Sequence, residues 1–114
     1  MNTPQILSIG NYLQTGAADA VRTVIYHNEE RELVLWQIPP QARLPAHRHL
    51  TGTDIWVVLQ GEAELTDGED SGRIIRCGDC VVSTPQTVHG AVNRGQTDCV
   101  LVSTVSPDIG YEAV

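Results

Sequence analysis

Apolar residues recur along the chain in short runs rich in Val, Ile and Thr, and clusters of Gly, Pro, Asn and Asp interrupt these runs. No segment sustains the apolar spacing of three to four residues that marks an amphipathic helix. Short apolar runs between closely spaced turns are typical of an antiparallel sandwich or barrel. The pattern predicts strands over residues 21–27, 31–38, 54–60, 62–66, 73–76, 80–83, 88–93 and 98–105.

The segments between these strands are mostly of hairpin length and contain turn-forming residues, for example Pro39-Pro40 and Gly78-Asp79. Residues 106–114 are predicted to leave the barrel or to lie across its rim. A chain of 114 residues fits one compact core. We therefore expect a single all-β domain over residues 1–114.

Seven basic and fourteen acidic residues give a formal charge of -7, and no Lys/Arg cluster could follow a phosphate backbone. This balance argues against nucleic acid as a partner. No apolar run reaches the roughly 20 residues of a membrane span, and the first residues lack the positive charge of a secretory signal. The odd number of cysteines, Cys77, Cys80 and Cys99, argues against a closed disulfide framework. We expect a soluble cytoplasmic protein.

Two histidines two positions apart, His47 and His49, would project from the same face of extended backbone, where one ion could reach both. Asp54 begins the longest apolar run and is a plausible further ligand on a neighbouring strand. His89 begins another predicted strand, which barrel closure could bring opposite the first pair. A His-x-His alone also fits paired surface histidines, so the prediction depends on the full pattern.

The order and spacing of these residues resemble the two sequence motifs of the cupin family. The first motif, over about residues 41–61, corresponds to Gln41, His47, His49, Asp54 and Gly61. The second, over about residues 78–93, corresponds to Gly78, Pro85, Gln86, His89 and Asn93. The resemblance implies a small jelly-roll β-barrel, or double-stranded β-helix, with a divalent transition metal bound inside by His47, His49, Asp54 and His89.

Three positions depart from the family pattern. Asp54 replaces the usual Glu, and it is shorter by one carbon-carbon bond of about 1.5 Å. It could ligate directly if its strand lies closer, or act through a water, or serve as a hydrogen-bond acceptor and proton carrier beside three histidine ligands. Gln41 and Gln86 replace two motif glycines at turns.

Imidazole ligands suit Fe, Mn, Ni, Zn and Cu, and three of them leave a coordination position for water or substrate. Strand alternation that turns Asp54 inward also turns in Trp56, Val58 and Gln60, so we expect a mostly apolar cavity with one amide at its far end. Arg43 is the best cationic residue for the rim, the alternative being solvated surface. Trp56, Gln60 and Arg43 are thus the predicted substrate-binding residues, and Asp54 and His89 the predicted catalytic residues.

Other residues fit structural roles. The Cys77 to Cys80 segment is expected to form a turn rather than a redox site, and Cys99 to fill buried space. Asn93 is expected to bind backbone in the turn after His89. Trp36 is expected in the core or an interface rather than in the cavity.

The leading functional hypothesis is a metal-dependent enzyme on a small organic substrate, dioxygenase-like by resemblance. Two alternatives stay open: a cyclase or isomerase like small cupins of polyketide pathways, and a non-catalytic module that binds or senses a small molecule. Exposed strand edges and apolar outer faces predict a homodimer.

Overall fold

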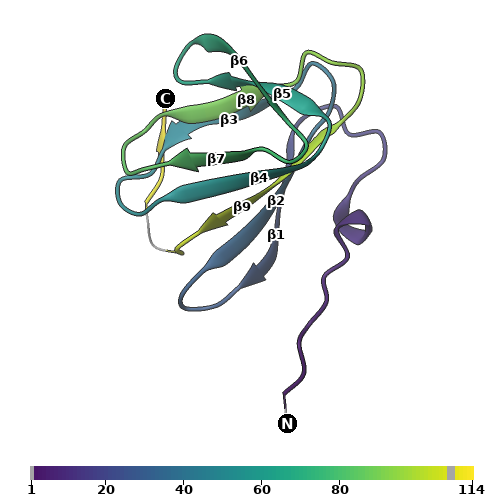
Figure 1. Ribbon diagram of the computed structural model, residues 1–114, viewed down its shortest axis with the longest axis vertical. Helices are drawn as coiled ribbons and strands as arrows, with labels where there is room; N and C mark the ends of the chain where they lie inside the picture. The colour runs from purple at the N-terminus through teal and green to yellow at the C-terminus, as the bar shows by residue number, and fades with distance from the viewer. Residues whose placement is uncertain (1, 108–109) are drawn as a thin grey trace.

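The computed structural model describes residues 2–107 and 110–114, and within them the chain forms a two-layered β-sandwich of the jelly-roll type (Figure 1). One short 3-10 helix precedes the strands, which lie in two antiparallel sheets. The sheet orders are β1-β2-β9-β4-β7 and β10-β3-β8-β5-β6. The elements are η1 (Ile9–Tyr12), β1 (Val21–His27), β2 (Glu32–Ile38), β3 (Arg43–Arg48), β4 (Asp54–Gln60), β5 (Glu62–Thr66), β6 (Asp70–Arg76), β7 (Cys80–Ser83), β8 (His89–Val92), β9 (Cys99–Val105) and β10 (Glu112–Ala113).

The predicted all-β fold is confirmed, and β1, β4, β5 and β7 have the predicted bounds. Three elements were not predicted as such: η1, β3 and β10. β3 was missed as a strand because Pro45 interrupts it, and proline cannot donate to a ladder. The structure accommodates Pro45 with a β-bulge, because the pairing of β3 with β8 shifts register between Leu44 and His47.

The core lies between the two sheets and is made of inward residues from both. Trp56, Val58 and Leu101 come from one sheet, and Leu44 and Ala91 from the other, each at most 1% exposed. Burial of these side chains supplies the main driving force for closing the sandwich. The inward residues of the two sheets thus form one continuous apolar cluster.

Asn93 has the predicted structural role. It is completely buried, and its Nδ2 donates hydrogen bonds of 2.8 Å to the carbonyl oxygens of Ile38 and Thr97. Its Oδ1 accepts a 2.9 Å hydrogen bond from the Gly95 amide. A buried amide with all three partners holds the turn after β8 to the loop before β9.

The N-terminal segment covers part of the outer face of the first sheet and then extends away from the sandwich (Figure 1). Leu7, Ile9, Tyr12 and Leu13 pack on a second apolar cluster formed by Ile25, Leu35 and Val100. Within the described parts of the chain, no helix is long and apolar enough to cross a membrane.

Gln41 and Gln86, the residues at two motif glycine positions, both adopt left-handed backbone, with φ of 71° and 66°. Glycine reaches this conformation without steric cost, whereas a residue with a Cβ is strained there. Both turns thus have the backbone conformation that glycine favours, although neither residue is glycine.

Candidate metal centre

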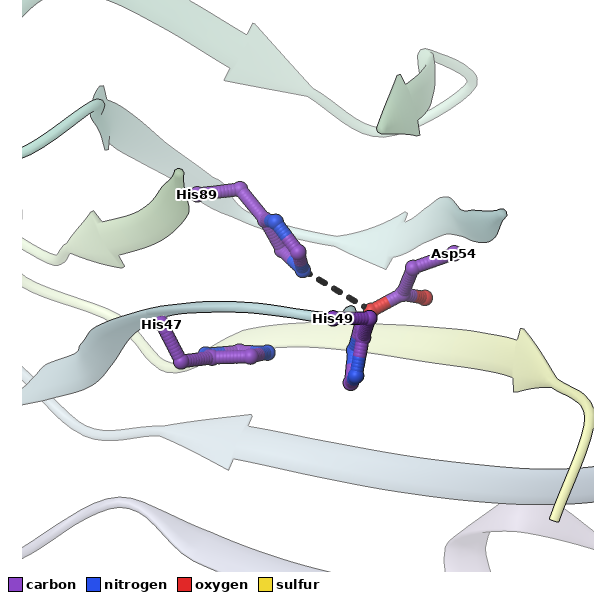
Figure 2. A group of neighbouring side chains, drawn as sticks. All are labelled: His47, His49, Asp54 and His89. Carbon is purple, nitrogen blue, oxygen red and sulfur yellow. Dashed lines mark hydrogen bonds and ion pairs between the residues drawn. The ribbon is translucent and has the colours of Figure 1, made fainter. Parts of the chain in front are cut away.

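Four side chains from both sheets converge at one end of the sandwich (Figure 2). His47 lies near the end of β3, His49 directly follows that strand, Asp54 begins β4, and His89 begins β8. One nitrogen of each ring and one oxygen of the carboxylate all lie within 4.8 Å of one another. The structure therefore brings together the four residues that the sequence pattern predicted to converge.

Strand pairing explains how two residues 42 positions apart in the sequence meet. His47 and His89 are direct partners across the antiparallel β3–β8 pair, so their side chains leave the same face. Their ring centroids are 4.3 Å apart. Two-residue alternation then adds His49 to the same face, and Asp54 approaches from the opposite sheet.

Backbone carbonyls fix the tautomer of all three rings. The Nδ1 of His47 lies 2.8 Å from the Pro45 oxygen, that of His89 lies 2.8 Å from the Thr87 oxygen, and that of His49 lies 2.7 Å from the Gly110 oxygen. A carbonyl only accepts, so each Nδ1 must carry the proton and donate. Each Nε2 is then left with a lone pair, as a metal ligand requires.

The Nε2 atoms face a carboxylate oxygen. Asp54 Oδ2 is 3.0 Å from Nε2 of His89 and 3.2 Å from Nε2 of His49. If the rings are neutral, the Nε2 lone pairs of His49 and His89 face the lone pairs of Asp54 Oδ2, and neither side can donate a hydrogen bond. The arrangement therefore calls for a cation between them, either added protons or a metal ion. Metal bonds of about 2.1 Å hold adjacent ligands about 3.0 to 3.4 Å apart. The contacts of Asp54 Oδ2 with His89 and His49 match this spacing, so the cluster of four donors could hold a metal ion.

Asp54 is held ionised in a buried position. Only 3% of its side chain is exposed, and its Oδ1 accepts a 2.5 Å hydrogen bond from the Ser103 hydroxyl on β9. Burial by itself would raise the pKa of this carboxyl. The hydrogen bonds from His89 and Ser103 and the charges of His89 and His49 together lower it, and the contributions of the two histidines apply when their rings are protonated at Nε2. The site therefore contains a fixed negative charge beside three imidazoles.

Burial lowers the pKa of His47, and this effect exceeds the opposing effect of the Pro45 carbonyl. The 5% exposed His47 ring is therefore neutral at neutral pH, which is the protonation state that binds metal.

A cavity of about 380 Å³ opens next to these residues. His47, His49, Asp54 and Ser103 form its polar wall. Its other lining residues are Arg22, Val34, Trp36, Pro45, Val105 and Tyr111. The wall is mostly apolar, as predicted, although the individual residues differ from the predicted ones.

Residues 110–114 lie across the rim of the cavity, one of the two courses predicted for residues 106–114, of which 108–109 lie outside the described residues. β10 pairs with β3, with Ala113 opposite His47. The Tyr111 ring stacks on the His47 ring with centroids 5.0 Å apart and an interplanar angle of 22°. This segment also supplies the Gly110 carbonyl that orients His49.

The three predicted substrate-binding residues lie elsewhere. Trp56 points inward but is fully buried edge-to-face against His89, outside the cavity lining. Gln60 is exposed, so its predicted inward position is wrong: a β-bulge between Val58 and Gln60 breaks the alternation. Arg43 is exposed on β3, where both its terminal nitrogens bind Asp70, and it corresponds to the solvated alternative.

The cavity residues that the sequence reasoning missed include four with polar or aromatic side chains: Arg22, Trp36, Ser103 and Tyr111. Trp36 was expected in the core or an interface, yet it lines the cavity. Two of the four carried a usable signal. Ser103 shares its inward parity with Cys99 and Leu101 on a buried strand, and Trp36 shares parity with Val34.

The cysteines match their predicted structural roles. Cys77 and Cys80 are exposed at the turn between β6 and β7, whereas Cys99 is completely buried in the core. Burial raises the pKa of the Cys99 thiol to about 11, so this thiol is protonated and inert at neutral pH.

Comparison with known proteins places the fold. The sequence profile of the family described as Cupin domain matches residues 34–105. No curated protein matches the chain. Among solved structures, the chain is similar to a conserved protein with a double-stranded β-helix domain from Klebsiella pneumoniae, at 29% identity and TM-score 0.89 over 98% of each chain.

Two further structures show how widely the fold is shared. KdgF from a Halomonas species is 27% identical, with TM-score 0.68 over 82% of this chain and 85% of that one. The polyketide cyclase RemF from Streptomyces resistomycificus is 16% identical, with TM-score 0.74 over 87% of this chain and 73% of that one. At that identity, RemF shares the fold alone.

Proposed function

Because the chain belongs to the cupin domain family, we propose that it is a metal-dependent enzyme acting on a small organic substrate, with dioxygenase-type chemistry as the first reaction to test. One observation carries the proposal: three Nε2 lone pairs and the Asp54 carboxylate converge beside a cavity. A purely structural cluster of this composition would not need to adjoin such a space.

His47, His49, His89 and Asp54 would hold a divalent transition metal, namely Fe, Mn, Ni, Zn or Cu. When bound, such an ion supplies Lewis acidity and, if it is redox-active, electrons for reactions with dioxygen. The chain contributes a preorganised ligand set, since each ring already donates Nδ1–H to a carbonyl. Little reorganisation is then required on binding.

We propose that Asp54 carries the acid-base work and that His89, the other predicted catalytic residue, positions it. Ser103 holds Asp54 Oδ1 by a 2.5 Å hydrogen bond, which leaves Oδ2 directed at the rings. Asp54 lines the cavity, so a substrate proton there has a carboxylate within reach. His89, only 3% exposed, lies behind this carboxylate and steadies its charge.

The volume and lining of the cavity limit the size and polarity of the substrate. About 380 Å³ is near the lower end of the range for small-molecule sites. Val34, Trp36 and Val105 add apolar surface to a lining that also contains the polar side chains. A compact, partly apolar molecule with a chelating oxygen pair fits this division of surfaces.

Elemental analysis of protein purified without a histidine tag tests the metal, followed by reconstitution with each candidate ion. We expect His49→Ala to lose the metal and turnover, and His27→Ala, an exposed histidine at the end of β1, to keep both. Oxygen consumption separates a dioxygenase from a cyclase or isomerase. Full activity of the metal-free wild type would refute metal dependence, and tight ligand binding without turnover under any metal would indicate a binding module.

We also infer a homodimer, because the outer face of β4 and β7 exposes apolar side chains: Ile55 is 37%, Leu59 40% and Val82 61% exposed. Light scattering tests this, and a monomer would contradict it. The three free thiols support a reducing, cytoplasmic location.

A further inference from the structure

A cationic side chain lines the cavity at a position that the metal centre does not use. Arg22 lies on β1 directly opposite Trp36 of β2, and both residues line the cavity. Directly paired residues project from the same face of a sheet, so Arg22 extends over the inner face beside Trp36. Among the described residues that form this lining, Arg22 is the one with a positive charge.

The guanidinium of Arg22 keeps donors for a ligand. Its Nη2 contacts Glu32 Oε1 at 3.1 Å, a single-atom contact, and its side chain is 50% exposed. Arg43 differs, since its two terminal nitrogens engage both oxygens of Asp70. A guanidinium has five N–H donors, so the Glu32 contact leaves Arg22 able to bind a second anionic group.

The charges around the cavity favour a ligand that is anionic at both ends. The chain carries a formal charge of -7, which disfavours approach of an anion unless the site itself is positive. A divalent ion on Asp54 would leave one end of the cavity positive, and Arg22 makes a second positive point on the lining. The apolar side chains of Val34 and Trp36 contribute to the wall of the same cavity.

We propose that Arg22 is a specificity-determining residue that binds a carboxylate of the substrate, and that the substrate is a small organic acid with a chelating oxygen pair at one end and this carboxylate at the other. The inference rests on the proposed metal-dependent function, because the metal is what would bind the chelating end. Glu32 occupies the guanidinium in the absence of ligand and is displaced or shared on binding.

Matched hydroxamates test this proposal on the zinc-loaded protein, because they chelate first-row metals through two oxygens. Succinic monohydroxamic acid carries a distal carboxylate where butyrohydroxamic acid carries a methyl group, and glutaric monohydroxamic and valerohydroxamic acids form a pair one methylene longer. We expect the carboxylate member of at least one pair to bind about tenfold more tightly, as one charge-assisted hydrogen bond allows. Arg22→Gln should abolish this preference, and Glu32→Gln should increase it.

Arg76→Gln is the matched control, since Arg76 is another exposed arginine with a single glutamate partner, Glu62, and lies outside the cavity. It should keep the tenfold preference. Equal binding within both pairs, or a preference that survives Arg22→Gln, would overturn the inference and leave the proposed metal chemistry standing. If the wild-type protein does not retain zinc, or if the zinc-loaded protein binds none of the hydroxamates, the proposed function is overturned and this inference with it.

Discussion

The sharpest structural prediction concerns Gly90, which follows the ligand His89 in β8. A Cβ at this position would lie 2.6 Å from Thr66 Oγ1, 2.8 Å from the Ala46 Cα and 2.8 Å from the Leu44 carbonyl oxygen. The threonine hydroxyl can rotate away, but the other two atoms are backbone of β3. Carbon atoms pack favourably about 3.5 to 4.0 Å apart, so Gly90→Ala must move β3 and β8 apart by about 1 Å.

This displacement has two consequences of different size. Overpacking of this kind costs about 1 to 3 kcal/mol of unfolding free energy. Metal ligation is more sensitive, because metal-ligand bonds tolerate an error of only about 0.2 Å. β3 carries His47 and β8 carries His89, so the same separation pulls two ligands apart. We therefore expect metal affinity to fall by at least about tenfold, as when an outer partner of a ligand is lost.

Urea denaturation of the metal-free protein measures the first effect, and competition with a chromogenic chelator measures the second. Gly10→Ala is the control, since its Cβ would meet nothing within 4 Å. It should stay within about 0.5 kcal/mol of wild type, as surface substitutions usually do. A Gly90→Ala protein of wild-type stability would refute the packing argument. A destabilised variant with unchanged metal affinity would refute the link between strand spacing and ligation.

Three further predictions concern single residues. Gln86→Gly should raise the unfolding free energy, measured by urea denaturation, by up to about 1 kcal/mol. Glycine relieves the left-handed strain at φ 66°, and the backbone entropy that it adds to the unfolded chain offsets part of this gain. A loss of stability would contradict the prediction. Trp56 Nε1 is buried without a hydrogen-bond partner among the described residues. Trp56→Phe should therefore lower the unfolding free energy by less than the roughly 3 to 5 kcal/mol of a large aromatic truncation. A loss in that range would show that the N–H is satisfied. Burial raises the pKa of the Cys99 thiol to about 11, above the ordinary value of a thiol. The unfolding free energy should therefore fall as the pH rises toward 11, by about 2 to 3 kcal/mol more in wild type than in Cys99→Ala. Parallel pH profiles of the two proteins would rule this out.

The sequence predicted elements whose signal is local. Alternation along β4 correctly placed Asp54, Trp56 and Val58 inward, and the spacing of His47 and His49 correctly put both on one face. The alternation fails at Gln60 because a bulge is a property of pairing with β9, which the residues of β4 do not specify by themselves.

The cavity residues were harder to predict because they meet through contacts between distant segments. Arg22 reaches the cavity only because β1 pairs with β2 in a register that sets it opposite Trp36. Tyr111 lies in a short polar segment with no periodic pattern, and its place follows from the pairing of β10 with β3. Arg43 was selected for its nearness in sequence to His47, whereas position around the barrel decides which cation faces the cavity.

The contact between His49 and Gly110 makes the C-terminal segment part of the thermodynamics of ion binding. The same hydrogen bond that orients this imidazole also anchors residues 110–114 on the barrel. Thermodynamic linkage makes the two events reciprocal. If docking of residues 110–114 strengthens ion binding by a given free energy, then ion binding strengthens the docking of this segment by the same amount. The Val114 amide, which donates to the Ala46 carbonyl, would report occupancy through slower exchange with deuterated solvent, at a distance from the ion itself.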